Sequence, residues 1–566
     1  MTISTLDILV IAAYLLVTLA IGVYQAMKIR TSGDYYAGGR KFGKFYMMMH
    51  ALSQASDADE PVGVIGGAYQ KGLAGVWLTY LYMPLTPIFW LMAPYIRRSR
   101  FLTTADFFEY RFDRSLSFLY ALTGVLKMSI AIGLVLKSTS MIFDSMTGGT
   151  INETWAILVM TVVFVIYGFA GGLRATVVTE SIQGPLIVIM SMLLLPFGFM
   201  AVGGFRGLHE TLPETMFHFT ATGHEFTPLW IVCASATALI GFIAGPQVVS
   251  LFASGKTELE GRIGYTYGTM IKRVCAIGWV FTGLIVAAMA AQGDLLANEV
   301  DRLGEKRELA FGTAMRALLP VGLIGLMFAA IFASQMAALS SRMVNSSALT
   351  SRNLYLAFVR PQASDREVLA VGRISGLFLV GLGVVLATAL ENVANALTML
   401  LQFSTIMGVV MWAGIFWRRA NVPGAWASVI LLFIPWAVFG PVGMMMQQAI
   451  PQLPDWIGMY GAARFVPQLM ACYLPAGVVG LILVSLMTKP PPTRQVEDFR
   501  TLLRTPVGHE QQLLDAGVRI VYAGNTQGHP WELRHPRLVH WGGFVLAVLI
   551  AAGIVLLLKV LAGIGS

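Results

Sequence analysis

The sequence reads Ala51-Leu52-Ser53-Gln54-Ala55-Ser56-Asp57-Ala58-Asp59-Glu60-Pro61 in the middle of an apolar segment near residues 45–69, and Gly63, Gly66 and Gly67 follow. A second apolar segment, near residues 228–252, contains Gly241-Phe242-Ile243-Ala244-Gly245-Pro246-Gln247. The two interrupted segments are the second and seventh predicted spans; they are five spans apart and therefore run in opposite directions. Segments interrupted in corresponding places of two halves are the best sequence indication of a binding site in a membrane transporter. The alternative interpretation is two unrelated kinks.

The composition indicates the class of protein. Hydrophobic residues make up 56% of the 566 residues, and charged residues make up 12%, about half of the ~25% usual in soluble domains. This composition excludes a soluble globular enzyme, a disordered chain and a fibrous protein. The apolar runs are continuous and roughly 20 residues long, which is the length of a helix that spans a ~30 Å hydrocarbon core. We therefore expect an all-α polytopic membrane protein.

Hydropathy predicts about 14 transmembrane helices. They lie near residues 7–27, 45–69, 74–96, 117–142, 153–171, 180–202, 228–252, 272–291, 318–345, 368–390, 393–417, 424–446, 466–488 and 539–561. We divide the chain into a first helix with its loop (1–44), two inverted five-helix repeats (45–202 and 228–417), two additional helices (418–488), a polar segment (489–538) and a last helix (539–566). Within the polar segment, Val496 to Leu514 forms a plausible amphipathic helix with Phe499, Leu502 and Leu503 as its apolar side.

Basic residues are concentrated in the odd-numbered loops between these spans. Outside the 489–538 segment they are Lys28, Arg30, Arg40, Lys41, Lys44, Arg97, Arg98, Arg100, Arg111, Arg114, Lys256, Arg262, Lys272, Arg273, Arg418 and Arg419. By the positive-inside rule these loops are cytoplasmic and both termini lie outside. The formal net charge of +9 therefore reflects orientation in a lipid bilayer, and we expect no nucleic-acid partner.

Charged residues inside the apolar segments are the first candidate site residues. Asp57 lies about 18 Å along a helix that starts near Phe45, close to the middle of the membrane. A charge at that depth costs about 2.5–3.5 kcal/mol, so it must be paired, protonated or hydrated. Two interpretations remain open: buried ion pairs that fix helix packing, or a role in substrate binding or ion coupling. The candidates are Asp57, Asp59, Glu60, Lys127, Glu180, Gly245, Gln247 and Arg342.

Five segments, in the right order, resemble the sodium:solute symporter family, whose members carry sugars, proline, pantothenate, carboxylates and similar solutes. They are Thr31–Arg40, Tyr95–Arg100 with Phe107-Phe108, Gly171–Ala175 with Thr179-Glu180 and Gln183, Ala337–Ser341 with Asn345-Ser346-Ser347, and Phe416–Arg419 with Gly424-Ala425. The resemblance covers about residues 5–490 and adds Gln183 to the candidate substrate or coupling residues. It implies a LeuT-type 5+5 inverted-repeat fold and secondary active transport of a small polar solute by alternating access across the cytoplasmic membrane.

The resemblance also implies a sodium site, from which this sequence departs. In the family a sodium ion lies between the first interrupted helix and a serine-rich helix. The matching positions here are Ala55 and Ala58 for carbonyls of the interrupted helix, Ser334 for a third carbonyl, and Ala337 and Ala338 for two hydroxyls. Hard cations need oxygen ligands, and alanine methyl groups supply none. Coupling to Na⁺, coupling to H⁺ and no ion coupling therefore all remain open, and no other cofactor or certain metal is expected.

The residue Arg342 has two possible positions. It follows Ala338 by one helical turn, so its guanidinium either reaches back toward the altered sodium site or extends to the cytoplasmic interface.

Two other function classes were weighed against transport. One is a transporter-like receptor that binds a solute and signals through residues 489–538. The other is an enzyme, which we do not expect because the sequence shows no Cys/His cluster and no paired catalytic carboxylates at a water-facing cleft.

The basic loops generate a prediction about topology. In a variant whose 3 native cysteines have been replaced, a single cysteine placed within residues 505–530 should react only with reagents that reach the cytoplasm. Labelling of intact cells by a membrane-impermeant maleimide measures this directly. Strong labelling from outside would reverse the orientation.

Overall fold

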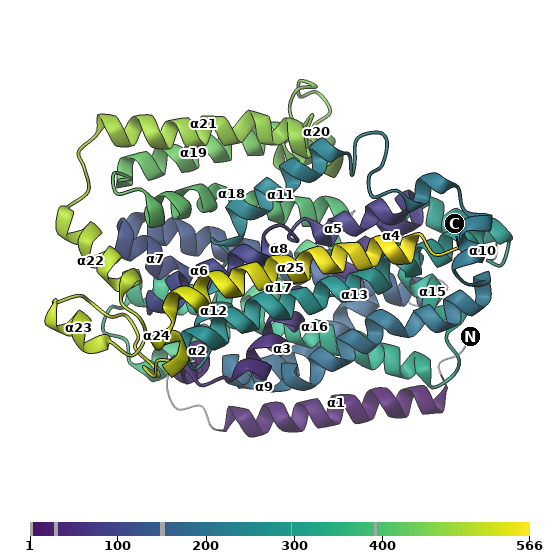
Figure 1. Cartoon of the computed structure of the whole chain (residues 1–566), viewed down its shortest axis with the longest axis horizontal. Coiled ribbons are helices and arrows are strands. Elements are labelled where there is room, and N and C mark those ends of the chain that lie inside the picture. Colours follow the sequence, from purple (N-terminus) through teal and green to yellow (C-terminus); the bar gives the residue numbers. More distant parts are fainter. Residues whose placement is uncertain (1–3, 28–31, 148–152, 296, 390–392, 566) are drawn as a thin grey trace.

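The computed structural model describes residues 4–27, 32–147, 153–295, 297–389 and 393–565, and throughout these ranges the regular structure is helical. In the described part of the chain, ten long helices lie roughly side by side, with shorter helices and loops between them and at the ends (Figure 1). They are α1 Thr5–Ala26, α8 Arg114–Met146, α9 Glu153–Val202, α13 Glu258–Gln292, α16 Leu323–Ala348, α17 Asp365–Ala389, α18 Val393–Phe416, α19 Val422–Phe439, α21 Val466–Met487 and α25 Pro536–Ala562.

Shorter helices connect the long ones. They are α2 Ser32–Ala37, α3 Lys44–Ala55, α4 Asp59–Lys71, α5 Trp77–Tyr80, α6 Thr86–Arg98, α7 Thr104–Arg111, α10 Gly204–Thr211, α11 Pro228–Phe242, α12 Val248–Ala253, α14 Ala297–Glu305, α15 Ala310–Leu318, α20 Pro441–Ala449, α22 Thr493–Arg504, α23 Glu510–Asp515 and α24 Pro530–Arg534. This arrangement confirms the predicted all-α class.

Within the described ranges, ten helices are long and apolar enough to cross a membrane. The four other predicted spans fall where a helix is interrupted or short. The spans near 45–69 and 228–252 are each split into two short helices, and the span near 74–96 ends in the 13-residue helix α6. The span near 153–171 is joined to the next one in α9, where Gly172 has a φ of 51°. The count of 14 spans and the division into two repeats stay predictions.

The two segments that contain glycine and proline, near residues 45–69 and 228–252, are both interrupted at the places that the sequence predicts. The first is split between α3 and α4 at residues 56–58, and the second is split between α11 and α12 at residues 243–247. In a continuous helix the nitrogen of Pro61 would face the Asp57 carbonyl, and that of Pro246 would face the Phe242 carbonyl. Proline has no hydrogen to donate to these oxygens. The two prolines therefore account for the positions of both interruptions.

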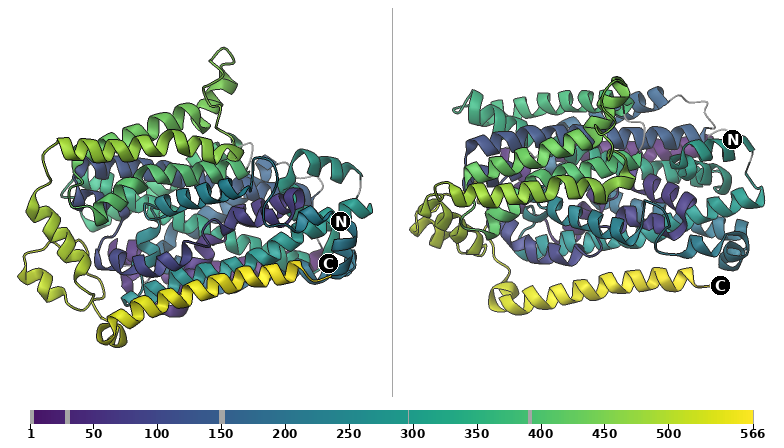
Figure 2. Two further views of the ribbon diagram at one scale, coloured as in Figure 1. Left: turned by 45° about the horizontal axis from the view of Figure 1, so that its top comes forward. Right: turned by 90° about the horizontal axis from the view of Figure 1, so that it is seen from above.

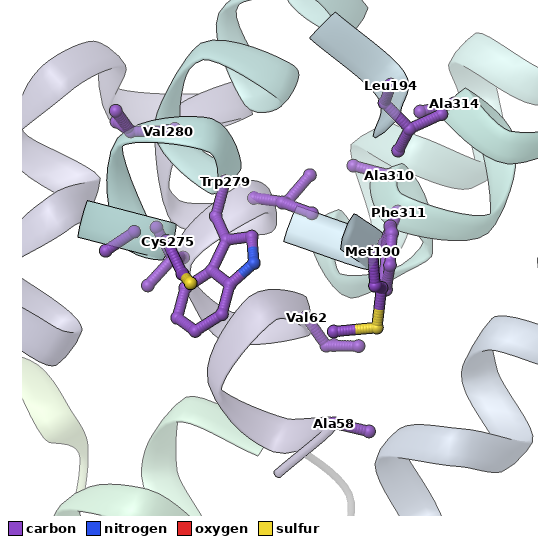
Figure 3. Close-up of a cluster of buried hydrophobic side chains, with 14 of the residues drawn as sticks. Ala58, Val62, Met190, Leu194, Cys275, Trp279, Val280, Ala310, Phe311 and Ala314 are labelled. Atoms are coloured by element: carbon purple, nitrogen blue, oxygen red, sulfur yellow. The ribbon is translucent and has the colours of Figure 1, made fainter. Parts of the chain in front are cut away.

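Helix α13 forms the packing surface for the first interrupted helix. A Cβ atom at Gly268 would lie 2.5 Å from the Met48 carbonyl of α3, and one at Gly283 would lie 2.5 Å from the Ile65 carbonyl of α4. Small residues allow this close approach, which drives helix association where lipid gives no hydrophobic advantage. Figure 3 shows Trp279 of α13 in the apolar cluster between these helices.

The structure corrects the predicted start of this helix. Helix α13 begins at Glu258 rather than near residue 272, because Thr257 and Glu260 form a capping box at its start. Its first turns are too polar for hydropathy to detect. Lys272 and Arg273, which were assigned to a cytoplasmic loop, therefore lie inside the helix, and both are buried.

The polar segment 489–538 covers one end of the helices, opposite the end where both termini lie (Figures 1 and 2). Helix α22 buries the predicted apolar side, Phe499, Leu502 and Leu503. It ends at Arg504 instead of continuing to Leu514, because Pro506 cannot donate to the Leu502 carbonyl.

Basic residues of the predicted cytoplasmic loops bind this segment. The Arg262 guanidinium pairs with Glu532 at 2.8 Å and the Arg100 guanidinium with Glu510 at 2.9 Å. Burial of the Glu532 carboxyl and the nearby Glu258 carboxylate raise the pKa of Glu532 above its ordinary value, whereas Arg262 opposes this shift. Lys28 and Arg30 lie outside the described residues.

The glycine contacts of α13 generate a prediction about stability. Gly268→Val should destabilise the protein by about 1–3 kcal/mol or more, because the added side chain meets backbone atoms of α3 that cannot move aside. Chemical or thermal unfolding of the purified protein in detergent measures the change. Gly553→Val in α25, where an added Cβ meets nothing within 4 Å, is the matched control and should have little effect. Equal losses in the two variants would contradict the packing account.

Candidate functional site

A cavity of about 190 Å³ lies between the two interrupted helices. The residues predicted from the sequence that line it are Ala55, Asp57, Asp59, Glu60, Lys127, Gly245, Gln247 and Arg342. Helices α8, α13 and α18 contribute other walls, including the ring of Tyr265. The cavity therefore brings together side chains from both predicted repeats, and its size suits a small solute.

The acid at the first interruption is paired with a cation from α16. The Nη2 atom of Arg342 contacts Oδ2 of Asp57, and its Nη1 atom donates to the Ala131 carbonyl at 3.4 Å. The side chains of Asp57 and Arg342 are 5% and 16% exposed. Of the two positions left open by the sequence, the structure has the guanidinium at the interrupted helix and not extended to the membrane interface.

A second pair joins α4 to α13. The Lys272 ammonium lies 2.8 Å from the Glu60 carboxylate, and both residues line the cavity. Next to it, the Arg273 guanidinium donates to the Thr79 hydroxyl at 2.8 Å. Sequence reasoning did not identify Lys272 and Arg273 as site residues because it placed them in a loop. A helical capping box at Thr257 was the signal that could have placed them correctly.

Other polar groups in the cavity lack protein partners. Buried oxygens with no hydrogen-bond donor among the described residues include Oδ1 of Asp57, Oδ1 of Asp59, Oε2 of Glu60 and Oε1 of Gln247. Lys127 lines the same cavity, and no described carboxylate lies within ion-pair distance of its ammonium. Unpaired buried acceptors and an unpaired cation are costly, so this site is suited to a ligand that compensates both.

Protein hydrogen bonds lie beside the positions that the family resemblance assigns to sodium. The Ser334 hydroxyl donates to the Ser56 carbonyl at 2.6 Å, in the interruption between Ala55 and Ala58. The Gln54 amide donates to the Ala337 carbonyl at 3.3 Å. Ala337 and Ala338 are buried and carry no hydroxyl. Within the described ranges there is also no cluster of three His, Cys, Asp or Glu side chains arranged for a metal ion.

Glu180 and Gln183 of α9 do not line the cavity. Oε2 of Glu180 lies 2.5 Å from Nδ1 of His50, and its Oε1 atom accepts a hydrogen bond from Gln54 at 2.7 Å. The Gln183 amide donates to the Tyr14 hydroxyl at 3.2 Å. His50 was not identified as a site residue from the sequence. A histidine one helical turn before Gln54 on the interrupted helix was the available signal.

The Arg342–Asp57 pair generates a prediction about stability. Asp57→Asn leaves a guanidinium without its carboxylate in a mostly buried site and should cost about 3–5 kcal/mol of folding free energy. Adding Arg342→Met removes the unpaired charge and should recover part of that loss. A double-mutant cycle on purified protein measures the coupling between the two residues.

The control for this cycle is Glu210→Gln, which breaks the exposed Arg206–Glu210 pair and should cost no more than about 1 kcal/mol. Additive losses at Asp57 and Arg342 would show that the two side chains do not form a coupled pair.

Comparison with known proteins agrees with this architecture. The sodium:solute symporter family model matches residues 35–431. The osmoregulated proline transporter OpuE of Bacillus subtilis is 25% identical over 75% of this chain and 86% of its own length. The sodium/proline symporter of Escherichia coli is 25% identical over 88% of this chain and 96% of its own length.

A solved structure shares the fold. The substrate-bound, outward-open structure of a Na⁺-coupled sialic acid symporter superposes with a TM-score of 0.70 at 18% identity, covering 86% of this chain and 99% of that one. The protein is therefore a multi-pass membrane transporter, a secondary active symporter and not an enzyme, and nothing among these relatives supports the receptor alternative. Since the family model covers residues 35–431 of the 566, the chain belongs to the sodium:solute symporter family.

Proposed function

We propose that this symporter carries a small zwitterionic solute across the cytoplasmic membrane and that a proton, not sodium, is its coupling ion. The solute binds in the cavity between the two interrupted helices, near Asp59, Lys127 and Gln247. The observation that carries the proposal is a set of groups that line this cavity: the Lys127 ammonium, with no described carboxylate within ion-pair distance, and buried oxygens that lack a donor among the described residues.

The unpaired groups favour a zwitterion over other small solutes. The Lys127 ammonium suits a carboxylate of the solute, and the oxygens of Asp59 and Gln247 suit an ammonium. A neutral sugar gives donors to the oxygens but leaves the lysine without a counter-charge. A simple carboxylate pairs with the lysine but leaves the oxygens without donors, at a cost of roughly 1–3 kcal/mol for each buried group. The two proline-carrying relatives support the same class of solute.

The hydrogen bonds at the altered sodium site favour a different coupling ion. The family places two hydroxyl ligands where this chain has Ala337 and Ala338. The Ser334 hydroxyl and the Gln54 amide instead satisfy carbonyl oxygens beside that position. A hard cation at this position would lack the two hydroxyl ligands that the family supplies. Na⁺ coupling, which the family suggests, is the alternative that the experiment must exclude.

The proposal predicts which solutes the purified protein accumulates in lipid vesicles. L-proline should accumulate when an inward proton gradient is imposed in sodium-free choline buffer, whereas glucose and pantothenate should not. Lys127→Met should raise the KM for L-proline about 10- to 100-fold, because a hydrogen bond to a charged group contributes about 1.5–3 kcal/mol.

The proposal has two parts, the coupling ion and the class of solute, and a different result would contradict each. Accumulation that requires sodium and fails in choline would reject proton coupling. Accumulation of glucose or pantothenate in preference to L-proline, with no effect of Lys127→Met, would reject the zwitterionic solute. The control variant is Lys489→Met, which changes a lysine of the polar segment and should leave the KM unchanged.

A further inference from the structure

A buried histidine and a buried glutamate are in contact beside the interrupted helix. His50 of α3 and Glu180 of α9 are both 0% exposed, and Nδ1 of His50 lies 2.5 Å from Oε2 of Glu180. The Gln54 amide, one helical turn after His50, donates both to Oε1 of Glu180 and to the Ala337 carbonyl of α16. The other ring nitrogen, Nε2 of His50, is buried and has no hydrogen-bond partner among the described residues.

We propose that His50 and Glu180 form the site at which this symporter binds its coupling proton. This inference rests on the proposed function, which requires such a site but does not locate it. Ionisable side chains inside a membrane bundle are costly and typically mark proton or ion pathways. The cavity acids Asp57 and Glu60 are engaged with Arg342 and Lys272, whereas the carboxylate of Glu180 faces a group that can itself gain and lose a proton.

The charge balance explains why the pair binds a proton. With a hydrogen on Nδ1, neutral His50 donates to the Glu180 carboxylate, and the pair carries one net negative charge. A proton arriving at the unpartnered Nε2 forms a bond to nitrogen and converts the pair to an imidazolium–carboxylate pair with no net charge. Release of that proton breaks the same N–H bond and restores the negative charge. Because a net charge on a fully buried pair is strongly disfavoured, the proton takes the place that a monovalent cation would occupy.

The helices around the pair carry other charged side chains. Helices α9, α12, α13 and α16 pack against α3. Apart from Glu180, the charged side chains described on these elements and on α3 and α4 are Lys44, Asp59, Glu60, Lys71, Arg174, Glu258, Glu260, Arg262, Lys272, Arg273 and Arg342.

Among the described contacts, none of those side chains is bonded to His50 or Glu180. Glu258, Arg262, Lys272 and Arg342 form the ion pairs with Arg98, Glu532, Glu60 and Asp57. Glu260 caps its own helix, and Arg273 donates to Thr79. Among the described contacts, Glu180 is the one charged group bonded to His50.

The position of the pair links the proton to the transport cycle. Gln54 connects Glu180 on the first predicted repeat to Ala337 on the second, and it also lines the solute cavity. Loss of the proton from Nε2 of His50 leaves the negative charge of the Glu180 carboxylate uncompensated, so the carboxylate draws the Gln54 amide more strongly. The contact between the two repeats at Ala337 then depends on protonation, which is the coupling that a symporter needs.

The test measures protonation without relying on transport. Infrared difference spectra of the purified protein in sodium-free lipid bilayers, recorded between acidic and alkaline pH, report each titrating carboxyl and imidazole group. The wild-type protein should show a titrating imidazole signal that is lost in His50→Gln, together with a shift of a carboxylate band that is lost in Glu180→Gln. The control is Asp144→Asn, which breaks the Arg302–Asp144 pair elsewhere and should leave both signals unchanged.

A transport measurement completes the test. In vesicles, Glu180→Gln and His50→Gln should each reduce proton-driven accumulation of L-proline about tenfold or more. Both variants should still exchange L-proline when the pH is equal on the two sides of the membrane. If either variant does not fold, as judged by size-exclusion chromatography, the other carries the test.

Spectra of both variants identical to the wild type, or proton-driven accumulation retained in both, would overturn the proposal. Absence of any L-proline transport by the wild-type protein would overturn the proposed function, and the infrared spectra would still decide whether the pair binds a proton.

Discussion

The ion pair between Arg342 and Asp57 is the interaction on which the centre of the molecule depends. Proline interrupts the helix next to Asp57, so a carboxylate and unsatisfied backbone groups lie deep among apolar helices. An uncompensated charge at this depth would be expelled or neutralised. The guanidinium from α16 supplies a permanent counter-charge, and the Lys272–Glu60 pair does the same one turn further along the chain.

These pairs require the helices to approach closely. Lys272 reaches Glu60 because α13 packs against both halves of the interrupted helix through Gly268 and Gly283, where any side chain would meet backbone atoms. Charge compensation and glycine packing are thus parts of one arrangement. Among the described residues it leaves Oδ1 of Asp59 and Oε1 of Gln247 without a donor and the Lys127 ammonium without a carboxylate, and a solute with both charges would complete the cavity.

Much of this arrangement could be predicted from the sequence, and the failures have physical causes. Pro61 and Pro246 indicated both interruptions, because a missing amide hydrogen acts locally. Lys272 and Arg273 were misplaced because hydropathy averages over a window and does not detect a helix whose first turns are polar. The contact between His50 and Glu180 joins residues 130 positions apart, and no local pattern encodes such a contact. The family resemblance indicated the altered sodium site, but only the structure showed that Ser334 and Gln54 donate to the carbonyls there.

The central claim is that fixed protein charges and a proton replace sodium at the interrupted helix. The most direct measurement is the current across a vesicle membrane containing the protein when L-proline is added in sodium-free buffer. The account predicts an inward current that grows as the external pH is lowered and does not change when sodium is restored. A current that is absent without sodium and appears on its addition would contradict the account.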